Sequence, residues 1–421
     1  MLKTHARKRH LSFHTPGHKI GKWDITELSF SDNLSSPRGC IAEAERDIAS
    51  ILGAKKSFIL TDGSTSGVLA MLYAVKRAGA KTVAASENTH KSFFNGCAAL
   101  GLSPLLFAQN YTENNLPLPL TAGDVEDETG VARGAWQAAD VLFLTSPDYY
   151  GNVAELAAIA ALCRREGKLL IVDGAHGGHL HFDKTDYVGG YADLWVDGVH
   201  KSLPALTQGA VVSARTEELA EYLRAGVDIF RTTSPSYPVM ASVEYAVKYP
   251  RNLPLERAVE TFKRANADRI YQNRDWTKLC AFFGAEAFEV EKRLESRGIY
   301  AEFCDGNVLT FYLSPATTKK QWKTLTKTLT ALFEKYPLRA VENVRERIPA
   351  PLVFKKDGET EWVEIGAAAG RICAADCGLF PPCTPLMRAG ERITEEKLGL
   401  LAKADNVYGL KENKNFVYKG E

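Results

Sequence analysis

The stretch DLWVDGVHKSLPALTQGAVVS (residues 193–213) places a histidine and a lysine between two short apolar runs. The runs at 193–197 and 209–213 have the length and composition of buried β-strands. Lys201 directly follows His200, and the chain soon returns to the second run. An amine kept out of bulk water in this way loses its proton more readily than an exposed one. The stretch therefore predicts a reactive polar site at the end of a buried strand.

The flanking sequence repeats this pattern of short apolar runs. Further strands are predicted at 56–61, 81–86, 104–108, 140–145 and 168–173, and amphipathic helices at 65–77, 88–100 and 154–166. Strands that alternate with helices are typical of an α/β fold with a mainly parallel sheet covered on both faces. In such folds ligands bind at the carboxyl ends of the strands.

The same pattern divides the chain into three parts. We predict an N-terminal arm and a helix (41–51) in residues 1–50, a large domain in 51–238, and a connecting helix with a smaller α+β domain in 239–421. Within the last part, long charged helices are predicted from 255 to 297, then a strand at 307–313 and a helix at 317–336.

Bulk composition narrows the class of protein. The 421 residues are 45% hydrophobic and carry a formal net charge of +1, so no overall field favours nucleic acid. The basic run at 3–10 is a single terminal segment, for which a solvated or partner-contacting arm is the better interpretation. No run approaches the ~18 consecutive apolar residues of a membrane span, and no signal-peptide core is present. We therefore expect a cytoplasmic protein.

Polar segments follow the predicted strands. DGSTSG (62–67) opens a helix with hydroxyl side chains, which suits a phosphate but also an ordinary helix cap. His90 begins the next helix, and SPDYYGN (146–152) is typical of a tight turn. Asp173 closes an apolar run, so its carboxylate either caps the following loop or needs a cationic partner to stay ionised.

Two clusters contain residue types that bind metals, but neither pattern favours a metal site. His176, His179 and His181 have no carboxylate ligand at helical spacing, so lining a pocket is the better hypothesis. The three cysteines within 373–383 contain no CxxC pair and have no histidine nearby, so we expect free thiols.

One ligand accounts for these segments together. Pyridoxal 5′-phosphate (PLP) needs a phosphate cradle, a flat side chain against its ring, a buried carboxylate at its pyridine nitrogen and a lysine for its aldehyde. The hydroxyl-rich helix start, His90, Asp173 and Lys201 supply one each. The sequence therefore predicts a PLP site.

The same motifs resemble the Orn/Lys/Arg decarboxylases, which are fold-type I PLP enzymes, and particularly their short bacterial members without a receiver-like N-terminal domain. The resemblance runs in order through FHTPGHKIG (13–21), TDGSTSGVLAML (61–72), ENTHKSFFNG (87–96), SPDYYGNVAEL (146–156), VDGAHGGHLHF (172–182), RTTSPSYPVMASVEYA (231–246) and FPPCTPLMRAGERIT (380–394). It covers nearly the whole chain. The motifs in this order are specific for the family, whereas any one of them alone would be weak evidence for it.

The resemblance implies roles for individual residues. Lys201 resembles the Schiff-base lysine, and His200 its neighbour at the cofactor phosphate or the substrate carboxylate. Asp173 resembles the partner of the pyridine nitrogen. Ala175 would pack on one face of the ring and His90 on the other.

Further positions follow from the same resemblance. His176 would lie near the ring oxygen, and Ser64, Thr65 and Ser66 match the phosphate loop. The segment with Ser234 and Ser236 reaches the partner subunit's site in relatives, which implies a homodimer or a higher homo-oligomer.

The sequence also departs from the family pattern. Gly198 and Val199 stand where relatives carry a Ser-Thr pair, which removes a hydroxyl from the phosphate site. Ser35 stands where many relatives carry histidine, and PPCTP (381–385) replaces Pro-Pro-Gly-Ile-Pro. These departures leave the predicted cofactor residues in place but leave the substrate open.

The resemblance implies decarboxylation of arginine, lysine or ornithine, a reaction of polyamine biosynthesis. Lys201, His200, His90 and Asp173 are the expected catalytic residues, and no metal is expected. Another fold-type I enzyme, such as an aminotransferase, aldolase or lyase, would use the same cofactor. A non-catalytic member with a binding or regulatory role is the remaining alternative.

Overall fold

The computed structural model describes residues 13–19, 23–107, 109–114, 116–126, 134–338, 359–379, 385–403, 407–412 and 414–419, and the single residues 3, 7 and 11. Residues 381–384 of the PPCTP departure and most of the basic run at 3–10 lie outside these residues. No helix in these ranges is both long and apolar enough to cross a membrane.

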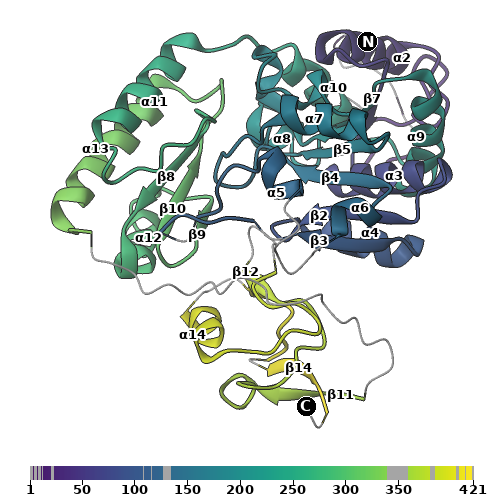
Figure 1. Cartoon of the computed structure of the whole chain (residues 1–421). Helices are drawn as coiled ribbons and strands as arrows, with labels where there is room; N and C mark the ends of the chain where they lie inside the picture. Colours follow the sequence, from purple (N-terminus) through teal and green to yellow (C-terminus); the bar gives the residue numbers. More distant parts are fainter. Residues whose placement is uncertain are drawn as a thin grey trace.

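A seven-stranded sheet forms the centre of the large domain (Figure 1). Its strand order is β1-β7-β6-β5-β4-β2-β3. β7 runs antiparallel to both of its neighbours, and all other neighbouring pairs are parallel. The strands are β1 (Lys56–Leu60), β2 (Thr82–Ser86), β3 (Ser103–Phe107), β4 (Val141–Thr145), β5 (Leu169–Gly174), β6 (Leu194–Asp197) and β7 (Ala210–Ala214).

Helices cover both faces of this sheet. Along β4, Val141 and Phe143 belong to one buried cluster and Leu142 and Leu144 to the other, as the alternation of a strand requires. The first cluster contains buried residues of three helices on that face, α3 (Ser64–Arg77), α4 (Lys91–Leu100) and α9 (Glu217–Phe230). The second includes α2 (Cys40–Leu52), α5 (Ala122–Glu126), α6 (Ala135–Ala138), α7 (Leu156–Arg165), α8 (Val199–Ser202) and α10 (Tyr237–Val247). The predicted α/β architecture is confirmed.

The predicted elements of this domain agree closely with the structure. Each strand predicted between 56 and 213 is present within about one residue of its expected bounds. The helix predicted at 88–100 begins only at Lys91, because His90 caps it: Ser92 N donates to His90 Nδ1 at 3.2 Å. This cap holds the His90 ring at the carboxyl edge of the sheet.

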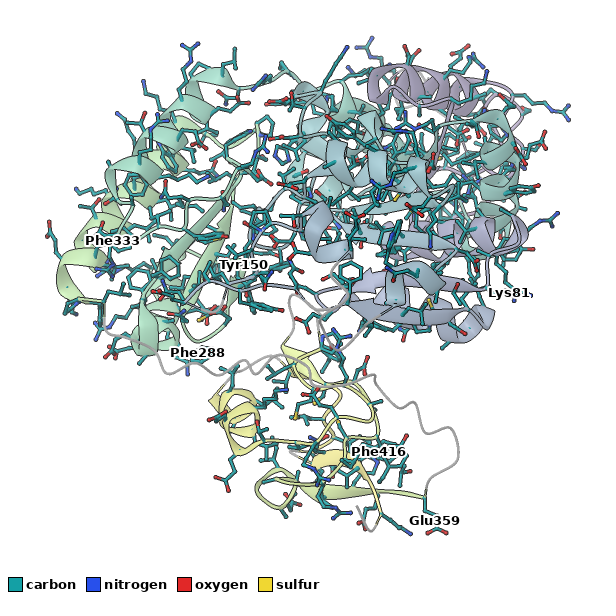
Figure 2. All side chains as sticks on the ribbon, in the orientation of Figure 1. Lys81, Tyr150, Phe288, Phe333, Glu359 and Phe416 are labelled. Carbon is teal, nitrogen blue, oxygen red and sulfur yellow. The ribbon has the colours of Figure 1, made fainter. Side chains whose placement is uncertain are left out.

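A smaller unit follows α10. It packs α11 (Leu253–Ala265), α12 (Ala287–Glu295) and α13 (Lys319–Lys335) against an antiparallel sheet of β8 (Lys278–Phe282), β10 (Val308–Tyr312) and β9 (Phe303–Cys304). The prediction of helices throughout 255–297 was wrong at β8, whose five residues are all buried and whose alternate residues belong to two different apolar clusters. Tyr150 lies where this unit meets the large domain (Figure 2), and its hydroxyl donates to Asp305 Oδ2 at 2.9 Å.

The C-terminal residues form a further lobe, drawn below the other two units in Figure 1. It contains α14 (Glu395–Lys403) and two small antiparallel pairs, β11 (Thr360–Glu364) with β14 (Lys414–Tyr418) and β12 (Gly378–Leu379) with β13 (Val407–Tyr408). Cys373 and Cys377 are buried here and unbridged, and Cys383 lies outside the described residues. The domain boundaries at 50 and 238 stay a prediction.

Candidate active site

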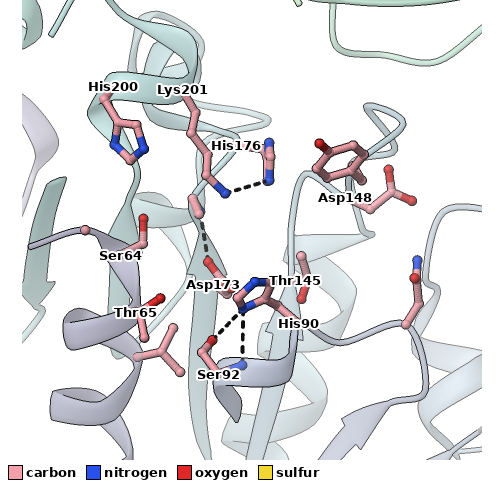
Figure 3. Close-up of a pocket in the computed structure, with 15 residues that line it drawn as sticks. Ser64, Thr65, His90, Ser92, Thr145, Asp148, Asp173, His176, His200 and Lys201 are labelled. Carbon is pink, nitrogen blue, oxygen red and sulfur yellow. Dashed lines mark hydrogen bonds between the residues drawn. The ribbon is translucent and has the colours of Figure 1, made fainter. Parts of the chain in front are cut away.

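A cavity of about 180 Å³ opens at the carboxyl ends of the central strands. Its walls come from the segments that follow β1, β2, β4, β5 and β6. These segments meet because parallel strands present their carboxyl ends at the same edge of a sheet. Figure 3 shows Lys201 descending into this cavity, with Asp173 and His90 below it and Ser64 and Thr65 to one side.

The predicted phosphate loop forms the start of α3 at one end of the cavity. Gly63 precedes it with a φ of +88°, a conformation that glycine adopts without strain. Ser64 and Thr65 line the cavity, and Ser64 Oγ is buried with no hydrogen-bond partner among the described residues. The Ser66 hydroxyl instead lies 2.9 Å from Asp62 Oδ1 and from the Gly63 carbonyl oxygen, and Ser66 does not line the cavity.

Gly198 lies directly against this loop. A Cβ atom there would stand 2.4 Å from the Ala175 carbonyl oxygen and 2.9 Å from Ser64 Oγ. Both distances are far below van der Waals contact, so the backbone approaches the loop closely only because residue 198 has no side chain. A serine at position 198 would therefore place its side chain against Ser64 Oγ, a hydroxyl that the loop already provides.

Asp173, the penultimate residue of β5, lies at the floor of the cavity. The residue is 5% exposed, and its Oδ1 accepts a hydrogen bond of 3.0 Å from Ala175 N. Burial raises the pKa of Asp173, against an opposing effect of the Lys201 charge. Ala175, the next residue but one, also lines the cavity.

His90 and His176 stand on different sides of Lys201 and are both neutral near pH 7. Burial, then the charge of Lys201, lowers the pKa of His90 to about 4. Burial, then the charges of Lys201 and Lys278, holds the pKa of His176 well below its ordinary value. His176 Nε2 lies 3.0 Å from Lys201 Nζ, so the neutral ring can accept a hydrogen bond from the amine (Figure 3).

His200 faces the phosphate-loop side of the cavity. Its Nδ1 lies 2.9 Å from the Gly209 carbonyl oxygen, which fixes the ring beside β7. Burial lowers the pKa of His200, and the contact with Gly209 opposes this shift.

The structure also brings in residues that the sequence did not single out. Asp148 and Tyr149, from the loop predicted only as a turn, line the cavity together with Thr145 and Asn88. Burial raises the pKa of Asp148 to about 6, although Asn152 and neighbouring amides donate to its carboxylate. The signal that could have found them is the position of their loop after β4, at the same sheet edge.

Three predicted positions lie away from this cavity. Ser234 is exposed, and Ser236 precedes α10 without a side-chain cap bond. Ser35 is also exposed, and its carbonyl oxygen accepts a hydrogen bond from Arg224.

Behind His176 lies a buried ionic cluster formed by His179, Asp275 and Lys278. Asp275 Oδ1 lies 2.9 Å from His179 Nε2, and Asp275 Oδ2 lies 3.3 Å from Lys278 Nζ. Burial would raise the pKa of Asp275, but His179 and Lys278 outweigh it and hold that pKa well below the usual range. The cluster links the loop after β5 to the start of β8, so it connects the cavity wall to the smaller unit.

Sequence comparison places the chain near characterised enzymes. Residues 22–278 match the model of the family described as Orn/Lys/Arg decarboxylase, major domain. The uncharacterised protein YaaO of Bacillus subtilis (strain 168) is 29% identical over 96% of this chain and 92% of its own length. The arginine decarboxylase of the same strain is 27% identical over the same shares of both chains.

Solved structures share the fold. The lysine decarboxylase LdcF of Francisella novicida superposes with a TM-score of 0.75 and 17% identity, over 99% of this chain and 80% of its own. The constitutive lysine decarboxylase of E. coli gives a TM-score of 0.71 at 20% identity over the same shares. A serine palmitoyltransferase of Sphingomonas wittichii gives 0.55 at 15% identity, over 73% of this chain and 81% of its own. The predicted fold-type I architecture is confirmed.

Proposed function

Because this chain belongs to the Orn/Lys/Arg decarboxylase family, we propose that it decarboxylates arginine, lysine or ornithine with PLP as its cofactor. Family membership makes it a PLP-dependent amino-acid decarboxylase, and the choice of substrate is the part that needs experiment. The observation that carries the proposal is the 3.0 Å contact between Lys201 Nζ and the neutral His176 ring, in a cavity that also holds Asp173.

The residues present fit the cofactor. The unpartnered Ser64 Oγ, with Thr65 and the first amides of α3, would hold the phosphate. Asp173 would hold the pyridine nitrogen, because a buried carboxylate is stabilised by a protonated ring nitrogen. Lys201 would hold the aldehyde.

The side chains around Lys201 then have separate tasks in the reaction. When bound, PLP supplies a conjugated ring that accepts the electron pair left behind as carbon dioxide departs. Neutral His90 presents a flat ring to the cavity without adding positive charge. Lys201, as a protonated ammonium beside His176 Nε2, could deliver a proton to the α-carbon of the substrate and would become a neutral amine, and His200 is the second candidate acid.

A panel of amino acids tests the proposal directly. Holoenzyme incubated with arginine, lysine and ornithine should release carbon dioxide and one of agmatine, cadaverine or putrescine, identified by mass spectrometry. If no amine forms from any of the three, the proposal is wrong. Consumption of an added 2-oxo acid would indicate an aminotransferase instead.

We also propose that the protein is cytoplasmic and that it forms a homodimer. The dimer is supported by large apolar side chains that are exposed on the single chain. Trp23 is 51% exposed, Leu206 is 51% exposed and Tyr245 is 60% exposed. Exposed apolar surface favours association with other chains. Ser234 and Ser236 remain our candidates for residues that reach the partner subunit's site.

A further inference from the structure

Three polar side chains border both the cavity and a smaller one beside it. Asn88, Thr145 and Asp148 line both spaces, and the smaller cavity has a volume of about 10 Å³. We call these three residues the polar wall. The hydroxyl oxygen of Thr145 is buried and has no hydrogen-bond partner among the described residues. The polar wall therefore offers a ligand an acceptor that the described part of the chain leaves unused.

Asp148 gives the polar wall a buried carboxyl group. The residue is 5% exposed. Its Oδ1 accepts hydrogen bonds of 2.9 Å from Tyr150 N and Asn152 N, and its Oδ2 accepts one of 2.8 Å from Asn152 Nδ2. Each carboxylate oxygen can accept two hydrogen bonds, so Oδ2 has capacity left for a ligand that enters the cavity.

The charge of Asp148 is not balanced within its surroundings. Tyr271 and Cys280, from the smaller unit, interact electrostatically with it. Burial, with the Asp148 charge acting in the same direction, raises the pKa of each to about 12, so both are neutral near pH 7. Among the described residues, no cationic side chain forms an ion pair with Asp148, although buried carboxylates are normally paired.

The charged groups elsewhere in the cavity are engaged with one another. The Lys201 charge opposes the effect of burial on the pKa of Asp173, and Lys201 Nζ lies 3.0 Å from His176 Nε2. Burial lowers the pKa of His90, His176 and His200, so these rings add no positive charge near pH 7. Asp148 is thus left to pair with a cation that comes from solution.

Asp148 also lies on the side of the cavity that a substrate would occupy. In Figure 3, Ser64 and Thr65 lie on one side of Lys201 and Asp148 lies on the other. The proposed cofactor would place its phosphate at the two hydroxyl residues and its aldehyde at Lys201, where the substrate must bring its amine. Because the phosphate side is then filled, the side chain of the substrate is directed toward the polar wall.

We propose that Asp148 binds the side-chain cation of the amino-acid substrate, and that Thr145 Oγ1 and Asn88 Oδ1 accept further hydrogen bonds from it. The inference rests on the proposed function, because it assigns to the polar wall the selection of basic over neutral amino acids. Asp148 is a specificity residue in this account and takes no part in bond breaking. Its loss should weaken binding of a cationic side chain and leave binding of an apolar one unchanged.

The test measures amine binding to the holoenzyme by calorimetry. It compares cadaverine, putrescine and agmatine with n-pentylamine, which lacks the second charge. The wild type should bind the amine of its own substrate at least about tenfold more tightly than n-pentylamine, from one charge-assisted hydrogen bond. Asp148→Asn should lose this preference and bind n-pentylamine as the wild type does.

Two further variants control for the loop and for charge. Asp148→Ser, whose hydroxyl can still accept from the loop amides, should lose the preference as Asp148→Asn does. Glu113→Gln, at an exposed position, should match the wild type. A preference that is absent from the wild type, or that survives in Asp148→Asn, would overturn the role of Asp148.

The pH dependence of the wild type tests the same role without a substitution. Burial raises the pKa of Asp148 to about 6, so the carboxyl is mostly ionised at pH 7.5 and mostly protonated at pH 5. The second charge of each amine persists at both values. The preference over n-pentylamine should therefore fall as the pH falls from 7.5 to 5. An equal preference at both pH values would contradict the inference.

Binding and turnover separate this inference from the proposed function. A preference that depends on Asp148, without carbon dioxide release from any basic amino acid, would support the role and overturn the decarboxylase proposal. Carbon dioxide release, together with a preference that survives in Asp148→Asn, would support the decarboxylase proposal and overturn the role.

Discussion

Gly198 and Asp197, next to each other at the end of β6, mark the limits of inference from the sequence. Gly198 departs from the family pattern by lacking a hydroxyl for the phosphate site, and the structure leaves no room for a Cβ there. Asp197 was not singled out. It is 1% exposed and accepts a hydrogen bond of 2.7 Å from the Tyr187 hydroxyl. Both depend on neighbours from distant segments of the chain, which the local sequence does not reveal.

Replacing Gly198 with serine should weaken cofactor binding. The added atoms would collide with the Ala175 carbonyl oxygen, which is backbone and cannot move aside. Overpacking of this kind costs about 1–3 kcal/mol, so the dissociation constant for PLP should rise roughly tenfold. Fluorescence titration of the cofactor-free protein measures it. Gly190→Ser is the control, since the nearest atom to its Cβ is 3.4 Å away; equal affinities in both variants would contradict the steric account.

Asp197 should make stability depend on pH. Burial raises its pKa to about 7, against hydrogen bonds from Tyr187 and Trp195. The native state therefore keeps a proton that the unfolded chain has lost above about pH 4, and this stabilisation disappears as the pH rises through 7. The amount is on the order of 4 kcal/mol.

Urea unfolding of the cofactor-free protein measures this effect. Relative to Asp197→Asn, the wild type should lose stability between pH 4 and pH 8, because the amide cannot ionise. Parallel stability curves for the two proteins would show that Asp197 has an ordinary pKa.

At the level of helices and strands, the local sequence pattern predicts where an element lies better than it predicts which elements contact one another. The strands of the large sheet were predicted because each is a short apolar run between polar turns. β8 was missed because LCAFF (279–283) lies among charged helical segments and has no alternation. The contact of His179 with Asp275 joins residues 96 positions apart and was beyond the reach of local pattern.

Asp275→Asn tests the link between the loop after β5 and β8. The change leaves Lys278 buried without its anionic partner, and breaking a buried pair in this way costs about 3–5 kcal/mol. Denaturant unfolding should show a loss of that size. Asp268→Asn, at an exposed position after α11, should change stability by less than about 0.5 kcal/mol. A similar small change for both variants would mean that the cluster contributes little.

The whole molecule contains contacts between residues that are far apart in the sequence. The C-terminal lobe reaches α4 through Arg388, whose guanidinium lies 4.8 Å from the Phe94 ring centre, and through Tyr408, whose ring lies 4.9 Å from Lys91 Nζ. The helix that His90 caps is thus held from outside as well as from the sheet. The ordered motifs predicted the family and its fold, but not this packing.

The oligomeric state of the whole protein is also a testable prediction. Sedimentation equilibrium should give twice the chain mass for the wild type. Leu206→Asp, five residues beyond Lys201, should shift the protein toward monomer, because a charge at an apolar interface is costly. Tyr300→Asp is the control, as that side chain is 74% exposed on the smaller unit. A wild-type monomer would contradict the homodimer.

The most direct test of the account is to locate the residue that bonds the cofactor. Holoprotein reduced with borohydride and digested should yield one peptide carrying a reduced phosphopyridoxyl group on Lys201, and Lys201→Ala should yield none. The same group on Lys278, or on no lysine of the wild type, would contradict the assignment of the cavity as a PLP site.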